Sequence, residues 1–313
     1  MYFYVVRRVL ATVPVLAVVA VVVFAILHLS PGDPAALIAG DHATPQQVEA
    51  IRARLGLDRP VHEQFFGWLA RLSRGDLGIS IFSNLPVTTL FLQRVEPTVA
   101  LAVLTTIIAV MLAVPIGILA AWRAGSWVDR AVMSFAVLGF SFPVFVVGYL
   151  LIVVFSMTLG LLPIQGYKPL ADGFWPFLRH LILPSFALGI GFMALIARIT
   201  RASVLEVLGQ DYIRTARSKG LATRQVLLSH ALQNAAVPIV TIIGVGIALL
   251  LGGVVVTESV FAIPGLGRLV VDAILSRDYP VIQGALLIFS AVYVLINLAI
   301  DLLYVVLDPR IRY

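Results

Sequence analysis

The sequence predicts an all-α membrane protein with six transmembrane helices, an extracytoplasmic insertion after the first helix and a water-facing cytoplasmic segment between the fourth and fifth. The first observation is composition, since 60% of the 313 residues are hydrophobic and 12% are charged. A soluble domain of this size carries about twice that charged fraction. The second observation is that long uncharged runs alternate with short charged segments, and the third is that basic residues lie at the ends of those runs.

Composition also excludes several kinds of site. The net charge is +6 and the pI is near 9.9, but the basic residues form no single patch, so we expect no nucleic-acid partner. The absence of cysteine excludes disulfides, thiol catalysis and Cys-ligated metals. The five histidines lack the spacing of metal ligands, so we expect no metal site.

Residues 1–29 are predicted to form a cytoplasmic N-terminus and the first transmembrane helix. No charged residue occurs between Val9 and Gly32, and Arg7 and Arg8 precede this run. The apolar core of a secretory signal has only about 7 to 15 residues, so this longer run is interpreted as a retained helix.

Residues 30–96 are predicted to form an extracytoplasmic domain, because this segment is rich in charged residues and proline. Thr44 is expected to cap a helix that begins at Pro45 and ends at Gly56. A second helix, in HEQFFGWLARLSRG, should pack its apolar stripe on its own domain or on the membrane surface. That stripe contains Phe65, Trp68, Leu69 and Leu72.

Residues 97–313 are predicted to form a core of five further helices. The second to sixth spans cover Pro97–Trp122, Ala131 to near Met157, about His180–Ala197, about Ala236–Thr257 and Tyr279–Ile300. Outer loops are expected around Lys168–Trp175 and over Glu258–Asp278. Two spans place small residues on one face, where another helix can approach closely. These residues are Ala109, Ala113, Gly117 and Ala121 in the second span and Gly244, Ala248 and Gly252 in the fifth.

The distribution of basic residues predicts that both termini are cytoplasmic. Basic residues in the short inner segments are Arg7, Arg8, Arg123, Arg130, Arg198, Arg201, Arg214, Arg217, Lys219, Arg224, Arg310 and Arg312. Those in the short outer loops are Lys168, Arg179, Arg268 and Arg277. The first group is three times the size of the second, as the preference of basic residues for the cytoplasmic side requires.

The segment from Ser203 to Pro238 carries charges between two apolar runs. Each charge near the centre of a bilayer costs about 3 kcal/mol, so this segment must face water. It is predicted to form two short helices, Val204–Lys219 and Arg224–Asn234. Gly220 would end the first in the left-handed conformation, and Thr223 would cap the second. Composition alone is equally compatible with an ordinary charged loop.

The chain lacks the motifs of an energy-converting or catalytic site. No GxxxxGK sequence precedes Ser or Thr, so we expect no ATP hydrolysis by this chain. Glu258 and Asp301 are the candidates for ionisable groups in the membrane, but both lie near span ends, where placement at the interface or pairing with another helix is favoured over a role in the transport path. Paired aspartates or a Ser/Lys or Ser/His constellation within a span, as an intramembrane enzyme requires, do not occur.

The sequence Arg214-Thr215-Ala216, followed by Gly220 and then by Pro238, resembles the EAA coupling motif of ABC importer permeases in the RTARxKG form of the peptide-transporter branch. Two features depart from the motif. Arg214 stands where the family has glutamate, and the gap between Gly220 and Pro238 is longer than in the sugar-importer form.

Further blocks, in the family's order, resemble the B-type permease of dipeptide, oligopeptide and nickel ABC importers. They are PGDP at Pro31–Pro34, LGLDRP at Leu55–Pro60, GDLGIS at Gly75–Ser80, HALQNA at His230–Ala235, ESVFAIPGLGRL at Glu258–Leu269, RDYPVIQG at Arg277–Gly284 and DPRIR at Asp308–Arg312. The resemblance therefore covers the chain from end to end.

This resemblance implies a multi-pass, non-catalytic subunit of the bacterial inner membrane, in contact with lipid. Its implied partners are a second, similar permease, two ABC ATPase subunits that bind ATP and Mg²⁺, and an extracytoplasmic solute-binding protein. The chain itself would hold no cofactor. Dipeptides or oligopeptides are the expected substrates, although nickel, glutathione and oligosaccharides remain open. The alternatives are a stand-alone channel or secondary transporter and an outer domain that acts as a sensor or scaffold.

The resemblance also implies roles for particular residues. The ATPase-coupling residues, within the coupling region 203–235, would be Arg214, Thr215, Ala216, Arg217 and Gly220. Arg214 and Arg217 would contact the ATPase, Ala216 would permit close approach and Gly220 would make the turn. The candidates for an outer gate or for contact with the binding protein are Glu258, Phe261, Pro264, Gly265 and Gly267. Asp301 is a candidate polar site within the membrane.

Overall fold

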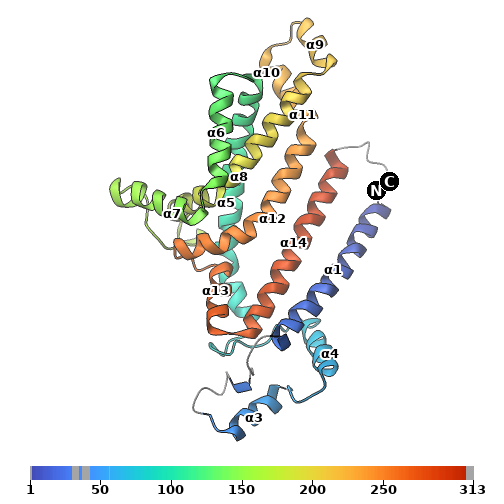
Figure 1. Ribbon diagram of the computed structural model, residues 1–313, viewed down its shortest axis with the longest axis vertical. Helices are drawn as coiled ribbons and strands as arrows, with labels where there is room; N and C mark the ends of the chain where they lie inside the picture. Colours follow the sequence, from blue (N-terminus) through green and yellow to red (C-terminus); the bar gives the residue numbers. More distant parts are fainter. Residues whose placement is uncertain (1, 30–34, 37–42, 56, 308–313) are drawn as a thin grey trace. The chain divides into compact units, whose positions relative to one another are not determined.

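The computed structural model describes residues 2–29, 35–36, 43–55 and 57–307, and most of these residues are helical (Figure 1). They fall into two compact units. The first contains Met1–Val9, Val95–Arg268 and Tyr293–Tyr313, and the second contains Leu10–Arg94 and Leu269–Val292. The PGDP block at Pro31–Pro34, the expected helix end at Gly56 and the DPRIR block at Asp308–Arg312 lie outside the described residues.

Five of the described helices, α1, α5, α8, α12 and α14, are long and apolar enough to cross a membrane. They correspond to the first, second, fourth, fifth and sixth predicted spans, and the all-α membrane fold is confirmed. The helices are α1 (Tyr2–Leu29), α3 (Pro45–Leu55), α4 (Val61–Leu72), α5 (Val87–Trp122), α6 (Trp127–Ser141), α7 (Val144–Leu151), η1 (Ile152–Thr158), η2 (Leu170–Asp172), α8 (Phe174–Leu208), α9 (Asp211–Ser218), α10 (Thr223–Gln225), η3 (Val226–Ala231), α11 (Leu232–Asn234), α12 (Ala236–Val260), α13 (Leu266–Ser276) and α14 (Tyr279–Leu307).

The stretch predicted as the third span is a bent pair of helices. Residues Trp127–Ser141 and Val144–Thr158 form two helical pieces whose axes differ by 105°. Phe142 is extended, with ψ of 127°, because the proline that follows it disfavours the helical conformation. Pro143 then caps α7. The uncharged run gives no hydropathy signal at this break, and the local signal was Pro143, which the prediction of a single span did not use.

Helix α8 extends beyond the predicted fourth span, His180–Ala197, at both ends. Trp175, expected in an outer loop, and Val204, expected to begin a separate helix, both belong to α8. Arginine and glutamate are good helix formers, so the charges after Ala197 do not end the helix. Gly209 and Gln210 separate it from α9.

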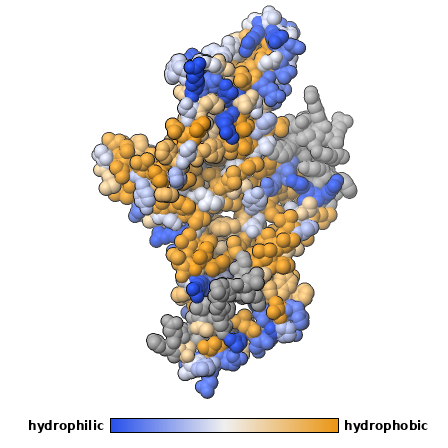
Figure 2. Space-filling view, viewed as in Figure 1, coloured by the Kyte–Doolittle hydropathy of each residue, from blue (hydrophilic) through white to orange (hydrophobic). Residues whose placement is uncertain are grey.

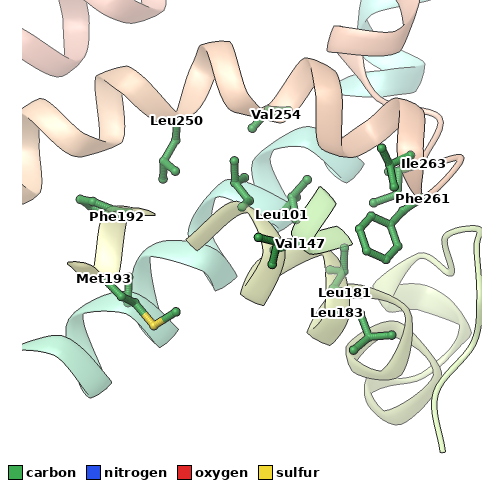
Figure 3. Close-up of a cluster of buried hydrophobic side chains, with 14 of the residues drawn as sticks. Leu101, Val147, Leu181, Leu183, Phe192, Met193, Leu250, Val254, Phe261 and Ile263 are labelled. Carbon is green, nitrogen blue, oxygen red and sulfur yellow. The ribbon is translucent and has the colours of Figure 1, made fainter. Parts of the chain in front are cut away.

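The first unit is built around α8, which packs against α6, α7 and α12. Its buried apolar cluster draws on four helices (Figure 3), with Leu181 and Phe192 from α8, Leu101 from α5, Val147 from α7 and Val254 from α12. Lipid is as apolar as these side chains, so close packing rather than the exclusion of water stabilises such contacts within a membrane.

The small residues of α5 lie against α8, as predicted. Ala109, Ala113 and Ala121 are buried. A Cβ atom added to Gly117 would lie 2.7 Å from Thr200 Cβ and 2.8 Å from the Ala197 carbonyl oxygen. Gly117 therefore sets the close approach of α5 and α8.

The stripe predicted on α12 is only partly correct. An added Cβ at Gly244 would meet Ile300 of α14, whereas at Gly252 it would meet nothing within 4 Å. The glycines that admit α8 are Gly246 and Gly253, where an added Cβ would lie 2.5 Å from Phe192 Cδ2 and 2.7 Å from Leu188 Cδ1. A spacing of four residues identifies a helix face but does not identify the neighbour that covers it.

The second unit confirms the predicted start of α3. The Thr44 N–H donates to Gln47 Oε1 at 2.8 Å, and the Gln47 N–H donates to Thr44 Oγ1 at 3.4 Å. This reciprocal pair is a capping box, and Pro45 follows it as the first helical residue.

Two residues of the predicted α4 stripe pack against α1 in the second unit, whereas Leu69 is exposed. The rings of Phe65 and Trp68 lie 5.2 Å and 5.7 Å from the ring of Phe24 in α1. The same unit holds a buried polar contact, in which Ser80 Oγ donates to Asp278 Oδ2 and the Ile81 N–H donates to Asp278 Oδ1 at 3.2 Å. This contact joins the segment before α5 to the residue before α14.

Candidate functional site

The charged segment between α8 and α12 is a helical elbow, which we define as residues 209–235. Its first helix, α9, is shorter than predicted, because Val204 to Leu208 continue α8. Its second helical stretch runs from Thr223 to Asn234, one residue longer at its start than the predicted Arg224–Asn234, with a π-helical segment, η3, in its middle. Thr223 is the first helical residue and Ala222 occupies the cap position, so the predicted Thr223 cap is wrong.

Gly220 ends α9 by the predicted mechanism. Its φ is +79°, in the left-handed region that favours glycine. The Gly220 N–H donates to the Arg217 carbonyl at 2.9 Å, and the Leu221 N–H donates to the Ala216 carbonyl at 3.4 Å. These two bonds form a Schellman motif, which pairs carbonyl groups that the helix end would leave without a donor.

The elbow has a small apolar core of its own. Ile213, Ala216 and Val226 are buried together, and Val207, Leu208 and Leu221 pack around them. Ala216 is 7% exposed. Its small side chain therefore faces Val226 within this chain, and the structure offers no open surface there for close approach by another protein.

The opposite face of the elbow is exposed and basic. Arg214 is 76% exposed in its side chain and lies 3.3 Å from the Asp211 carboxylate, one turn earlier on α9. Thr215, Arg217 and Lys219 are also exposed. Tyr212 and Leu228 add exposed apolar surface. Figure 2 shows hydrophilic side chains over the end of the first unit that carries α9 and α10.

Glu258, in the last turn of α12, is a buried structural carboxylate. Its side chain has no exposed surface. Thr98 Oγ1 of α5 donates to Glu258 Oε1 at 2.5 Å, and the Arg268 N–H donates to Oε2 at 3.0 Å. Thr98 Oγ1 in turn accepts from the Leu266 N–H at 2.8 Å. We call residues 258–268 the 258–268 turn. Through these bonds, Glu258 holds the turn against α5.

The glycines of this turn provide room for the carboxylate. A Cβ added to Gly265 would lie 2.5 Å from Glu258 Oε2, and one added to Gly267 would lie 2.6 Å from Val255 Cα. Phe261 is also buried, whereas Pro264 is exposed. Of the five residues predicted to form an outer gate or contact surface, four are therefore packed inside the first unit.

Asp301 forms an ion pair with Arg8 of α1. Both residues belong to the first unit. Interfacial placement or pairing with another helix was the favoured interpretation of Asp301, and the structure shows the pairing.

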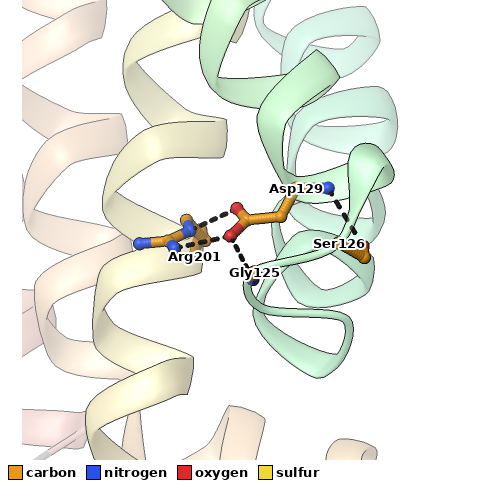
Figure 4. Close-up of polar contacts among 4 residues, drawn as sticks. All are labelled: Gly125, Ser126, Asp129 and Arg201. Atoms are coloured by element: carbon orange, nitrogen blue, oxygen red, sulfur yellow. Dashed lines mark hydrogen bonds and ion pairs between the residues drawn. The ribbon is translucent and has the colours of Figure 1, made fainter.

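A second ion pair was missed by the sequence analysis (Figure 4). Arg201 Nε donates to Asp129 Oδ1 at 2.6 Å, and Arg201 Nη2 donates to Oδ2 at 2.7 Å. We had counted Arg201 only as a basic residue at a span end. Ser126, three residues before Asp129, indicates a helix N-terminus, but no local pattern indicates the pairing with Arg201.

The segment between η1 and α8 is held by polar contacts within the first unit. The Tyr167 hydroxyl donates to Glu96 Oε1 at 2.9 Å, and the Gly166 N–H donates to the Phe261 carbonyl at 2.8 Å. Burial, and then the bond to Glu96, raise the pKa of Tyr167 above its usual range. Among the described residues, no group of three or more histidine or carboxylate side chains is placed to hold a metal ion.

Two models of known protein families match the sequence of this chain. The family described as "Binding-protein-dependent transport system inner membrane component" matches residues 113–313. Its N-terminal companion, "Binding-prot-dependent transport system membrane comp, N-term", matches residues 1–102.

Similar proteins match along nearly their whole length. A probable peptide ABC transporter permease protein of Sinorhizobium fredii is 52% identical over 99% of both chains. The glutathione transport system permease protein GsiC of Escherichia coli is 47% identical over 99% of both chains. A putative peptide transport system permease protein of Brucella abortus is 46% identical over 98% of both.

A solved structure shows the same fold. The MetNI methionine ABC transporter in an inward-facing conformation matches with a TM-score of 0.59 at 19% identity, over 71% of this chain and 97% of that chain. The resemblance found in the sequence is thus confirmed by family, relatives and fold. The chain belongs to the inner membrane components of binding-protein-dependent transport systems, the permease subunits of ABC importers.

Proposed function

We propose that this chain imports peptides as one half of an ATP-driven translocation path. The observation that carries this proposal is its 52% identity, over 99% of its length, to a protein named as a peptide ABC transporter permease. The GsiC relative, at 47% identity, makes glutathione, itself a short peptide, a candidate of the same class. Nickel and oligosaccharides are less well supported alternatives.

The elbow is proposed as the part that receives force. Its exposed Arg214, Thr215 and Arg217 would contact an ATPase subunit, while Ile213 and Ala216 keep α9 fixed to its own short core. The elbow follows α8 directly and leads directly into α12. A displacement of α9 would therefore act on two membrane helices at once.

The remaining partners follow from this role. We propose a second permease subunit, two ATPase subunits that hold ATP and Mg²⁺, and an extracytoplasmic solute-binding protein, with no catalysis by this chain. Residues 30–96 would lie outside the cytoplasm, and both termini and the elbow would lie inside. Of the five residues predicted to form an outer gate or contact surface, Pro264 is exposed and would be available to the binding protein.

Two experiments test this proposal. The chain contains no cysteine, so Lys219→Cys provides a single label, and a membrane-impermeant maleimide should react with it only in inverted vesicles. Reaction in intact cells would contradict the orientation. Proteoliposomes that contain both permease subunits and the solute-binding protein should take up peptide only when the ATPase subunits are also present, whereas flux through this chain alone would favour a channel or secondary transporter.

A further inference from the structure

The ion pair between Asp129 and Arg201 joins two helices of the first unit. Both Arg201 bonds to the carboxylate are short and nearly equal, at 2.6 Å and 2.7 Å, as in a bidentate pair. The Asp129 side chain is 7% exposed and that of Arg201 is 25% exposed. A partly buried pair with this geometry restricts the relative orientation of the helices that carry it.

Asp129 is also fixed from its own side. The Gly125 N–H donates to Asp129 Oδ2 at 2.9 Å, and the Asp129 N–H donates to Ser126 Oγ at 3.5 Å. The carboxylate therefore accepts hydrogen bonds from Arg201 on one side and from Gly125 on the other (Figure 4). The bond from Gly125 fixes its position relative to the turn between α5 and α6.

Arg201 lies close to the elbow along α8. It precedes Leu208, the last residue of α8, by seven residues, or about 10 Å of helix. The residue before it, Thr200, contacts α5 at Gly117, where no side chain would fit. At Thr200 and Arg201, α8 is thus packed against α5 and bonded to α6.

Helix α6 continues, through the 105° bend, into α7. A Cβ added to Gly148 of α7 would lie 3.2 Å from both Val260 Cγ1 and Phe261 Cε2, at the end of α12. The same end of α12 carries Glu258. Contiguous contacts therefore run from the elbow through α8, α6 and α7 to the C-terminal end of α12.

We propose that Asp129 and Arg201 are positioning residues that make α6 and α7 move with α8 when the elbow is displaced, so that the movement reaches the 258–268 turn. This proposal rests on the coupling role proposed for the elbow. Contiguity alone does not demonstrate coupling, so the test must measure the pair's effect on movement and on transport.

The first experiment measures transport and ATP hydrolysis together in proteoliposomes that contain the complete importer. In the Asp129→Asn variant, which keeps the shape but removes the charge, the number of substrate molecules transported per ATP should fall about tenfold. Assembly with the ATPase subunits and basal hydrolysis should be retained. The matched control is Glu49→Gln, which breaks the exposed pair with Arg52 on α3 and should leave the ratio unchanged.

The Arg201→Lys variant separates geometry from charge. Lysine keeps the positive charge but lacks the planar fork that binds both carboxylate oxygens. The variant should fold and assemble, with a transport ratio between those of the wild type and Asp129→Asn. If both variants transport at the wild-type ratio, or if both fail to fold, the pair has no positioning role of the kind proposed.

The second experiment measures movement directly, using spin labels on cysteines placed at two exposed positions, Leu150 of α7 and Ala202 of α8. In the wild type, the distance between the labels should stay the same with and without bound nucleotide. In the Asp129→Asn variant, the distribution of distances between the labels should broaden, or its mean should change when nucleotide binds. An unchanged distribution in the variant overturns the proposal.

The two proposals fail in different ways. If the wild-type chain does not associate with ATPase subunits, the proposed function fails, but the label distribution of the isolated chain still shows whether the pair holds α7 to α8. If association and uptake are normal, but the variants change neither the transport ratio per ATP nor the distance between the labels, the positioning role alone is wrong.

Discussion

The elbow and the 258–268 turn contain similar residues that serve different physical purposes. Each combines charged side chains with glycines at a helix end. In the elbow, the charges are exposed and Gly220 stands in open space, where only its positive φ requires glycine. In the turn, the charge of Glu258 is buried, and Gly265 is required because no volume remains for a side chain. An exposed charge is available to a partner, whereas a buried and bonded charge stabilises its own chain.

This comparison predicts a graded series of effects on stability. The largest effect is expected for Gly265→Ala, since the added methyl would overlap the Glu258 carboxylate. We expect a loss of about 3 kcal/mol in the free energy of unfolding. Intrinsic tryptophan fluorescence during denaturation in detergent measures it. Gly252→Ala is the matched control, because an added methyl there meets nothing within 4 Å, and wild-type stability in both variants would contradict the crowded turn.

The second prediction concerns the carboxylate itself. Glu258→Gln keeps the size of the side chain but weakens the bonds from Thr98 and from the Arg268 N–H, so we expect a loss of about 2 kcal/mol. A double-mutant cycle with Thr98→Val tests whether the two side chains act together. Additive losses in that cycle would show that the bond between the two side chains contributes little to stability.

The third prediction moves to the elbow. Gly220→Ala should lose about 1 kcal/mol, because only the left-handed backbone conformation is disfavoured. Asparagine tolerates that conformation better than alanine, so Gly220→Asn should lose less. Equal losses in the two variants would show that something other than backbone conformation requires glycine here.

The smallest effect on stability is expected for the double variant Arg214→Glu with Arg217→Glu. Both side chains are exposed, so stability should change by no more than about 0.5 kcal/mol. Association with the ATPase subunit, measured by co-purification, should nevertheless be lost, because two positive contacts become negative. The control reverses Arg71 and Arg74, which are exposed at the same spacing in the second unit. Normal association in the elbow variant would remove the coupling role.

The helices of this fold were largely predictable, since local patterns encode them. Runs of apolar residues long enough to cross a membrane predicted α1, α5, α8, α12 and α14, and the capping signals of Thr44 and Gly220 predicted helix ends. The bend between α6 and α7 was missed because hydropathy is uniform across it and Pro143, which marks the break, was not used to divide the run. The length of α8 was underestimated because charge was taken as a sign of a helix end.

The site residues were harder to predict. Arg214 and Arg217 were identified by a motif, and their exposure is compatible with contact to a partner. The same motif assigned Ala216 to a partner, whereas its side chain packs against the core of the elbow. Asp129 was passed over because nothing near it in sequence indicates Arg201, 72 residues away.

The sequence by itself determined which segments are apolar enough for the membrane, which segment between them must face water, where α9 ends and which family the chain resembles. The first three depend on residues within a few turns of one another, and the resemblance depends on the order of short local blocks along the chain. Only the tertiary structure decided that Glu258 is bonded to Thr98, 160 residues earlier, and that Arg201 reaches Asp129. A carboxylate has the same composition whether it is exposed or buried, and its role depends on which distant donors the folded chain brings within hydrogen-bond reach.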